Sequence, residues 1–99
     1  MYRRFTTVEF GSASQRHDAL GFIGDTVQVL RSMPGFEAAY YLDVDELRIV
    51  VVTIFDSEEA LQAIDHEDEA LRGRARSIGV TFPRTDQYPV MAFAVSGAP

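Results

Sequence analysis

The stretch from Ile49 to Leu61 reads IVVVTIFDSEEAL, and the rest of the chain is interpreted outward from it. Its first seven residues, up to Phe55, are apolar or β-branched, which predicts a strand with apolar side chains on both faces. Asp56 then begins a polar run, and Glu59 three residues later completes a capping-box-like pair, which indicates the start of a helix. The stretch therefore predicts a buried strand that passes directly into a helix.

Hydrophobic periodicity and turn residues predict the remaining elements. The chain is expected to begin with a strand at Tyr2–Phe10 and a helix that Ser14 caps and Met33-Pro34-Gly35 ends. The later elements are expected to be strands at Phe36–Leu42 and Leu47–Phe55, a helix from Asp56 to about Ser77, a loop at Thr81–Gln87 and a strand at Tyr88–Val95. This β-α-β-β-α-β order predicts one α+β domain over residues 1–99, a ferredoxin-like fold with two helices on one face of a four-stranded antiparallel sheet.

The predicted sheet has an apolar face that two helices cannot cover. Val50, Val52 and Ile54 point to one side of the third strand while the apolar residues between them point to the other. An exposed apolar face of this kind promotes aggregation unless something packs on it. We expect a second copy to cover it, sheet on sheet, in a twofold dimer that buries more than about 2,000 Å². The alternative is that the loop at 79–87 folds over this face.

The composition excludes several classes of function. Nine basic residues, all arginine, stand against fifteen acidic residues, and a net charge of −6 argues against binding to a nucleic-acid backbone. The sequence contains no Cys, Lys, Asn or Trp, which removes thiol and Schiff-base catalysis. No apolar run approaches the roughly 18 residues of a membrane span, and no secretory signal is visible. We therefore expect a cytoplasmic protein with neither a nucleic-acid nor a membrane partner.

Two junctions make the chain similar to a known family. The helix-to-strand junction Met33-Pro34-Gly35-Phe36 and the strand-to-helix run 52–61, in this element order, resemble the dimeric α/β-barrel superfamily, especially its antibiotic-biosynthesis-monooxygenase-like branch. The resemblance implies a homodimer with a ligand cavity between the sheet and the helices. Members of this group oxidise aromatic polyketides or quinols with dioxygen and without a cofactor, or degrade haem, and many have no established activity.

The residues that the family's haem degraders use are missing here. Counted without gaps from Phe55, their second-helix tryptophan falls on Ile64 and their haem-ligating histidine falls on Arg74, and their first-strand asparagine has no counterpart. A guanidinium group cannot ligate haem iron. We therefore expect no cofactor, unless a shifted alignment brings His66 to the ligand position.

The two histidines are expected at the surface. On a helical wheel His66 lies nearly opposite the apolar stripe of the second helix, and His17 lies off the stripe of the first. No second histidine or paired carboxylate shares a face with either of them at the spacing that a metal ion requires. The sequence therefore predicts no metal site.

Asp68 is the candidate catalytic residue. It lies within the apolar stripe, four residues after Ile64 and three before Leu71, where an ionised carboxylate is costly to desolvate unless it is paired. A buried carboxyl group with a raised pKa could take a proton from a phenol or an activated carbon. The alternatives are that residues 65–69 interrupt the helix, or that Asp68 pairs with Arg72.

Four more residues are candidates for the ligand pocket. Phe55 and one of Tyr40 and Tyr41 would supply apolar and stacking walls, because adjacent residues of a strand place one phenol on each face. Arg74, at the edge of the stripe, would hold an anionic or enolate oxygen at the rim. Other arginines could also attract an anionic substrate, although those of the second helix equally complement its dipole: Arg3, Arg4, Arg72 and Arg76.

Two classes of function remain open. The first is a small cofactor-independent oxygenase that binds an aromatic or quinol-type substrate in an apolar cavity, where a carboxylate or tyrosine removes a proton and dioxygen attacks the carbanion. The second is a non-catalytic dimeric module that binds a ligand or has a purely structural role. A pocket that holds a desolvated Asp68 or Arg74 favours the enzyme, and a cavity filled by Phe, Ile and Met favours the module.

Overall fold

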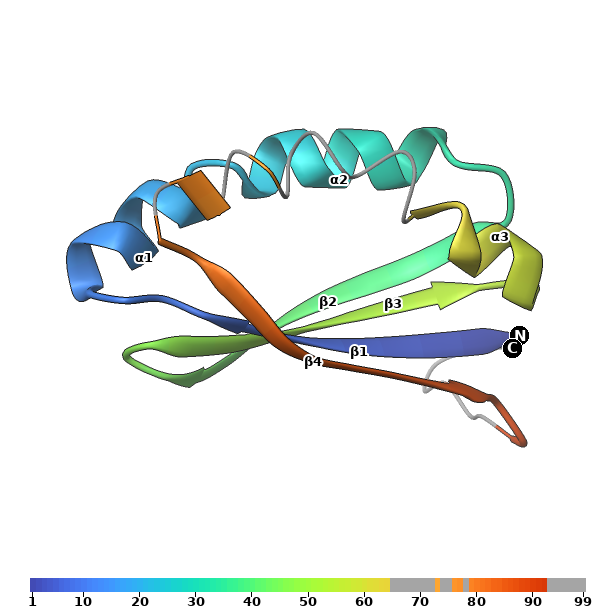
Figure 1. The fold of residues 1–99 in the computed structure, drawn as a ribbon. Helices are drawn as coiled ribbons and strands as arrows, with labels where there is room; N and C mark the ends of the chain where they lie inside the picture. Colours follow the sequence, from blue (N-terminus) through green and yellow to red (C-terminus); the bar gives the residue numbers. More distant parts are fainter. Residues whose placement is uncertain (65–72, 74–75, 78, 93–99) are drawn as a thin grey trace, which may run out of the picture.

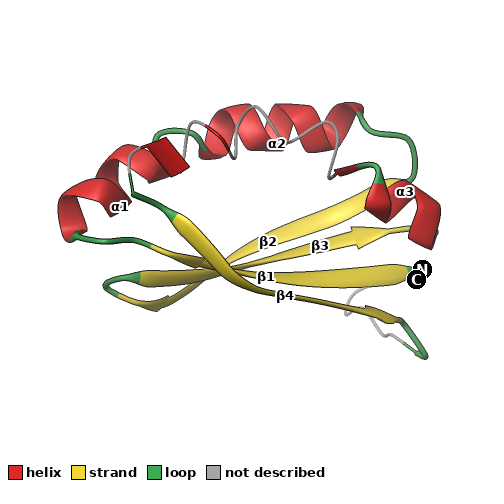
Figure 2. Cartoon of the chain, in the orientation of Figure 1, coloured by secondary structure: helices red, strands yellow, loops and turns green. Residues whose placement is uncertain are grey.

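The computed structural model describes residues 1–64, 73, 76, 77 and 79–92, which form an antiparallel sheet with helices on one face (Figure 1 and Figure 2). In chain order the elements are β1 (Tyr2–Glu9), α1 (Ala13–Leu20), α2 (Ile23–Ser32), β2 (Phe36–Asp45), β3 (Arg48–Phe55), α3 (Glu58–Gln62) and β4 (Thr81–Pro89). The four strands lie in the order β2-β3-β1-β4, with every neighbouring pair antiparallel. This topology confirms the predicted ferredoxin-like α+β fold.

The first helical segment is divided into two helices. Ser12, and not Ser14, caps α1, since the Ser12 hydroxyl accepts the backbone N–H of Gln15 at 3.1 Å. The helix ends at Gly21, whose flexible backbone disfavours a helix interior, and α2 begins two residues later. The prediction of one continuous helix starting from Ser14 is therefore wrong. No described helix is long and apolar enough to cross a membrane.

The fourth strand lies earlier in the chain than expected. The predicted loop at Thr81–Gln87 belongs to β4, and the predicted strand at Tyr88–Val95 is wrong because β4 ends at Pro89. The last part of that predicted strand falls in residues 93–99, outside the described residues. Pro83 favoured a loop, but β4 is an edge strand, where a residue without a backbone N–H is tolerated. The irregularity in the pairing of β1 with β4 falls beside this proline.

The hairpin between β2 and β3 is longer than the sequence pattern predicts. The strands extend to Asp45 and from Arg48, which leaves Glu46 and Leu47 as the turn in place of residues 43–46. The carboxylate of Asp45 accepts the backbone N–H of Leu47 at 2.9 Å and Nη2 of Arg48 at 2.7 Å. The hydrogen bond from Arg48 is the main reason that the pKa of Asp45 is lowered.

The helix segment after β3 also begins one residue later than predicted. Ser57 is its cap, because its hydroxyl accepts the backbone N–H of Ala60 at 3.2 Å, whereas Asp56 precedes the helix. Leu61 and Ile64, the first two members of the predicted apolar stripe, are buried. The rest of the stripe lies outside the described residues.

Two apolar clusters occupy the face of the sheet that the helices cover. The first cluster contains Val8, Phe10, Ile49 and Val80, and the second contains Leu30, Met33, Phe55, Leu61 and Ile64. Phe36 packs edge-to-face on Phe55 in the second cluster, with ring centroids 5.6 Å apart. The described core therefore consists of two separate apolar clusters at different positions along the strands. Residues that belong to neither cluster lie between them.

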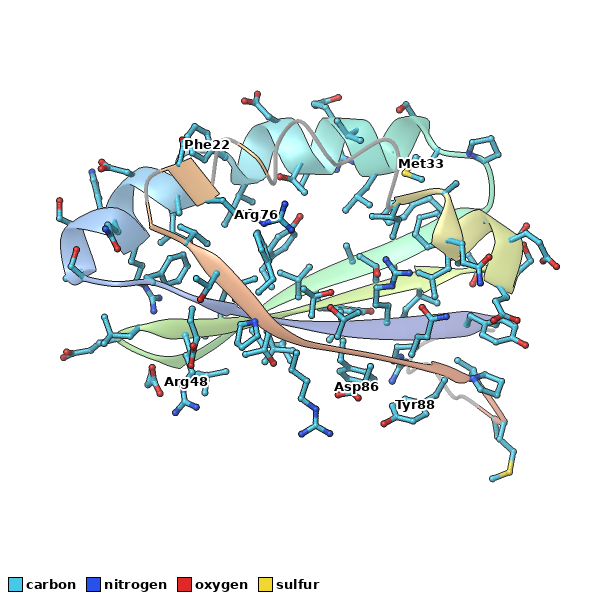
Figure 3. The ribbon with its side chains drawn as sticks, viewed as in Figure 1. Phe22, Met33, Arg48, Arg76, Asp86 and Tyr88 are labelled. Atoms are coloured by element: carbon cyan, nitrogen blue, oxygen red, sulfur yellow. The ribbon has the colours of Figure 1, made fainter. Side chains whose placement is uncertain are left out.

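The opposite face of the sheet carries exposed apolar side chains. Tyr40, Leu42 and Tyr88 are 55%, 46% and 53% exposed, and Figure 3 shows Tyr88 on the side away from the helices. None of the described elements covers this face in Figure 1. Most of the segment 79–87, the alternative cover, is a strand of the same sheet. We refer to this surface as the apolar sheet face, with the side chains Phe5, Tyr40, Leu42, Val50 and Tyr88 on it.

Gly35, between α2 and β2, is expected to be intolerant of a side chain. Its φ is +82°, and an added Cβ would overlap the carboxylate of Asp56 and lie 2.9 Å from Cβ of Ala60. We expect Gly35→Ala to lower the free energy of unfolding by about 2 kcal/mol or more, since positive φ alone costs an alanine about 1–2 kcal/mol. Gly24→Ala is the matched control, because nothing lies within 4 Å and alanine favours its helix by up to about 1 kcal/mol. Urea denaturation compares the two variants, and equal shifts would contradict the prediction.

Candidate functional site

A cavity of about 120 Å³ lies between the sheet and the helices. The described part of its wall comes from β1, β2, β3, β4 and the helices, and it is mainly apolar. Its apolar residues include members of both core clusters, such as Val8 and Ile49 from the first and Leu30 and Ile64 from the second. An apolar cavity of about 150 Å³ accommodates benzene. The volume here therefore corresponds to roughly one aromatic ring.

Four polar side chains cross the floor of the cavity. Arg4, Thr6 and Thr53 are buried, with 4%, 7% and 6% of their surfaces exposed, and Tyr41 joins them in the cavity wall. Arg4 and Thr53 face each other in the pairing of β1 with β3. Thr6 is two residues after Arg4 on β1, so its side chain lies on the same face of the sheet. We call these four residues the polar band. Along the strand direction, the polar band lies between the first and the second apolar cluster.

The Arg4 guanidinium is held in place by the neighbouring edge strand. Gln87 on β4 faces Arg4 on β1, and its Oε1 accepts hydrogen bonds from Nε and Nη2 of Arg4 at 3.2 and 3.0 Å. The neutral amide of Gln87 thus orients the guanidinium of Arg4. A permanently charged group is thereby fixed at the floor of an apolar cavity.

Two threonines of the cavity wall differ in how their hydroxyl groups are used. Thr26 on α2 donates to the backbone carbonyl of Phe22 at 3.1 Å. The hydroxyl of Thr53 is buried, and within the described residues it has no hydrogen-bond partner. Buried hydroxyl groups are rarely left unsatisfied in native proteins. Thr53 therefore offers a donor and an acceptor to whatever occupies the cavity.

The structure separates the residues that the sequence proposed for the pocket. Tyr41 lines the cavity, and Tyr40 lies on the apolar sheet face, so the adjacent tyrosines do occupy opposite faces. Phe55 has no exposed surface and packs in the second apolar cluster, not on the cavity wall. Asp68 and Arg74 lie outside the described residues.

The other charged candidates have distinct positions. His17 is exposed on α1, as predicted, and His66 lies outside the described residues. Arg76 is exposed, with its guanidinium carbon 5.5 Å from the centroid of the Phe82 ring. Figure 3 shows it between the helix layer and β4. Because Phe82 lines the cavity, this arginine places positive charge near the cavity edge.

Sequence reasoning gave little weight to most of the polar band. Arg4 was one of several arginines considered for an anionic substrate, while Thr6, Thr53 and the Gln87 partner of Arg4 were not considered. A usable signal existed on β1, because Arg4 and Thr6 alternate in phase with Val8, which belongs to the buried face. An arginine in phase with a buried face indicates a polar site within the core.

The comparisons with known proteins identify the fold. No family model and no curated protein matches the sequence. A dimeric ferredoxin-like protein from an uncultured marine organism matches in structure at 19% identity and a TM-score of 0.74, over 96% of this chain and 99% of that one. A monooxygenase of Streptomyces coelicolor, from the gene ActVA-Orf6 and in complex with nanaomycin D, matches at 19% identity and 0.70, over 96% and 92%.

A third solved structure shows another use of the same architecture. A variant of MhuD with two manganese protoporphyrin IX molecules per active site matches at 20% identity and a TM-score of 0.73, over 96% of this chain and 99% of that one. At these identities the likeness establishes the fold. The chain has the ferredoxin-like fold, and its structural neighbours include a dimeric ferredoxin-like protein and a monooxygenase.

Proposed function

We propose that this protein is a small monooxygenase-like enzyme that oxidises an aromatic or quinol-type substrate, without a cofactor, in the cavity between the sheet and the helices. The observation that supports this proposal is an apolar cavity of one-ring size crossed by the polar band. Apolar walls would bury the ring, and a few fixed polar groups would orient it. The same walls would keep water away from a reactive carbanion.

The proposed reaction starts with the removal of a proton from the substrate. Asp68 remains the proposed base, and Tyr41 is the alternative from the cavity wall. The resulting carbanion would then reduce dioxygen. For an activated methylene group the balance is R₂CH₂ + O₂ → R₂C=O + H₂O, in which one oxygen atom forms the carbonyl and the other leaves as water.

Oxygen uptake in the presence of a one-ring quinol, or of a one-ring compound with an activated methylene group, tests this function. We expect the wild-type protein to accelerate uptake and Asp68→Ala to lose about 10²–10⁴-fold of that rate, the usual contribution of a general base. His17→Ala removes an exposed side chain of α1 and should leave the rate unchanged. A wild-type protein that binds the ligand without consuming oxygen would instead be the non-catalytic dimeric module.

The proposed assembly is a homodimer that joins two apolar sheet faces. The exposed Tyr40, Leu42 and Tyr88 support it, since side chains of this size on one sheet face are normally covered. A dimeric protein among the structural neighbours supports it as well. A twofold axis would place the same face of each copy against the other.

A further inference from the structure

Thr53 is the one polar residue in the apolar run of β3. Every other residue from Ile49 to Phe55 is aliphatic or aromatic. The Thr53 side chain lies in the wall of the cavity, and only 6% of the residue's surface is exposed. Valine has nearly the same shape as threonine and would fill this position without the cost of removing a hydroxyl group from water. The packing of the strand therefore does not explain the hydroxyl.

The Thr53 hydroxyl requires a partner that the described part of the chain does not supply. Its oxygen is buried, and it makes no hydrogen bond to any described residue. The cross-strand neighbour of Thr53 on β2 is Ala39, whose side chain carries no polar atom. A buried hydroxyl without a partner is rare and costly, because it has lost its hydrogen bonds to water. A molecule in the cavity that carries a polar atom would satisfy it.

A second threonine of the cavity wall shows how the protein satisfies such a group by itself. Thr26 on α2 donates to the backbone carbonyl of Phe22 at 3.1 Å, so its own helix supplies the partner. A residue of β3 has no equivalent route, because β3 is paired on both sides and its carbonyls lie in the plane of the sheet. Its side chains stand perpendicular to that plane. The hydroxyl of Thr53 is therefore placed for a bound molecule.

We infer that the Thr53 hydroxyl binds and positions a one-ring ligand through an uncharged hydroxyl group on the ring, as in a phenol or a hydroquinone. The rest of the described wall is mainly apolar and encloses roughly the volume of one ring, which matches such a ligand. A threonine hydroxyl can accept the phenolic O–H and can donate to the phenolic oxygen. The inference rests on the proposed function in that this ligand is its substrate. It adds the substrate class and a positioning residue.

Binding of phenol and of toluene to the intact protein tests this inference. The two probes have nearly the same size, and only phenol carries a hydroxyl. Phenol is uncharged at pH 7, so its binding does not depend on a cation in the wall. NMR titrations give the ratio of the two dissociation constants, toluene over phenol. We expect Thr53→Val to lower this ratio about fivefold or more, the effect of losing one hydrogen bond.

Two further variants are the matched controls. Thr26→Val makes the same substitution in the same wall, but it removes a hydroxyl that the helix already uses, so the ratio should stay that of the wild-type protein. Thr53→Ser keeps the hydroxyl and should preserve the preference for phenol that Thr53→Val loses. An unchanged ratio in Thr53→Val, or an equal fall in Thr26→Val, would overturn the inference. A wild-type protein that binds neither probe would overturn it as well.

Thr53→Val is expected to fold, because replacing an unpartnered buried hydroxyl by an apolar group of the same shape is nearly neutral or stabilising. Its Tm without ligand should equal or exceed that of the wild-type protein. A marked fall would show that the protein itself uses the hydroxyl, and would count against the inference. These measurements need no turnover. A phenol preference that depends on Thr53, without oxygen uptake, would therefore reject the proposed enzyme but keep the site. Oxygen uptake with an unchanged KM in Thr53→Val would reject the site but keep the enzyme.

Discussion

Leu42→Asp is expected to convert the proposed dimer into a monomer. Leu42 is 46% exposed on the apolar sheet face, so the change leaves the interior of one protomer untouched. In the proposed interface each copy would bury an unpaired carboxylate, at a cost of about 3 kcal/mol or more, and the twofold axis doubles that cost. A total of about 6 kcal/mol raises the dissociation constant by roughly four orders of magnitude. Light scattering at micromolar concentration measures the change in mass.

A matched control separates this effect from the added charge itself. Gln28→Asp introduces the same carboxylate at an exposed position of α2, on the opposite side of the molecule, and should leave the dimer intact. Both variants should keep the circular dichroism spectrum of the wild-type protein. A wild-type protein that is monomeric at this concentration, or a Leu42→Asp protein that remains dimeric, would show that the apolar sheet face is not the interface.

Local sequence patterns were sufficient to predict most of the sheet. The alternation from Tyr2 onward and the apolar run to Phe55 each determined a strand within one or two residues, because side chains in a strand alternate between two environments. The pairing of β2 with β3 followed from their short connection. These features depend on neighbours along the chain, and one sequence contains enough information to predict them.

The errors occurred where the tertiary position determines the outcome. Pro83 disfavours a central strand but is tolerated at the sheet edge, and no local pattern reveals which strand will be the edge. The first helical segment divides at Gly21. A glycine within a helix costs up to about 1 kcal/mol, and tertiary packing decides whether the helix continues through it. In both places the residue type allowed two structures, and long-range packing selected between them.

The candidate site was the least predictable part. The cavity followed from the family resemblance, and Tyr41 from the alternation of β2. The pairing of Arg4 with Gln87 joins residues 83 positions apart, and only the strand order brings them together. Phe55 is on the face of β3 that lines the cavity, so the sequence pattern could not distinguish it from a wall residue. In the structure it lies beyond the cavity, inside the second apolar cluster.

Phe55→Ala is expected to produce the largest loss of stability. The Phe55 side chain is fully buried and packs against Phe36, Leu30 and Leu61. Truncation of such a side chain costs about 3–5 kcal/mol, a large share of the roughly 5–15 kcal/mol that stabilises a typical domain. For a domain of this length that loss lowers Tm by more than about 12 °C. Thermal unfolding at one fixed protein concentration measures it, since the proposed dimerisation would make Tm depend on concentration.

Phe82→Ala provides the comparison that separates a core residue from a cavity wall. This change removes the same atoms from a half-buried ring that lines the cavity. The free energy of unfolding should fall by less than about half as much as in Phe55→Ala. The reason is that the lost transfer free energy and the cost of the new void both increase with the burial of the removed atoms. The main effect of Phe82→Ala should be weaker binding of a one-ring phenol such as 4-nitrophenol, because the one-ring cavity loses part of its wall. If Phe55→Ala instead weakened binding while leaving Tm unchanged, Phe55 would belong to the pocket, as the sequence suggested, and the boundary between the cavity and the second cluster would have to move.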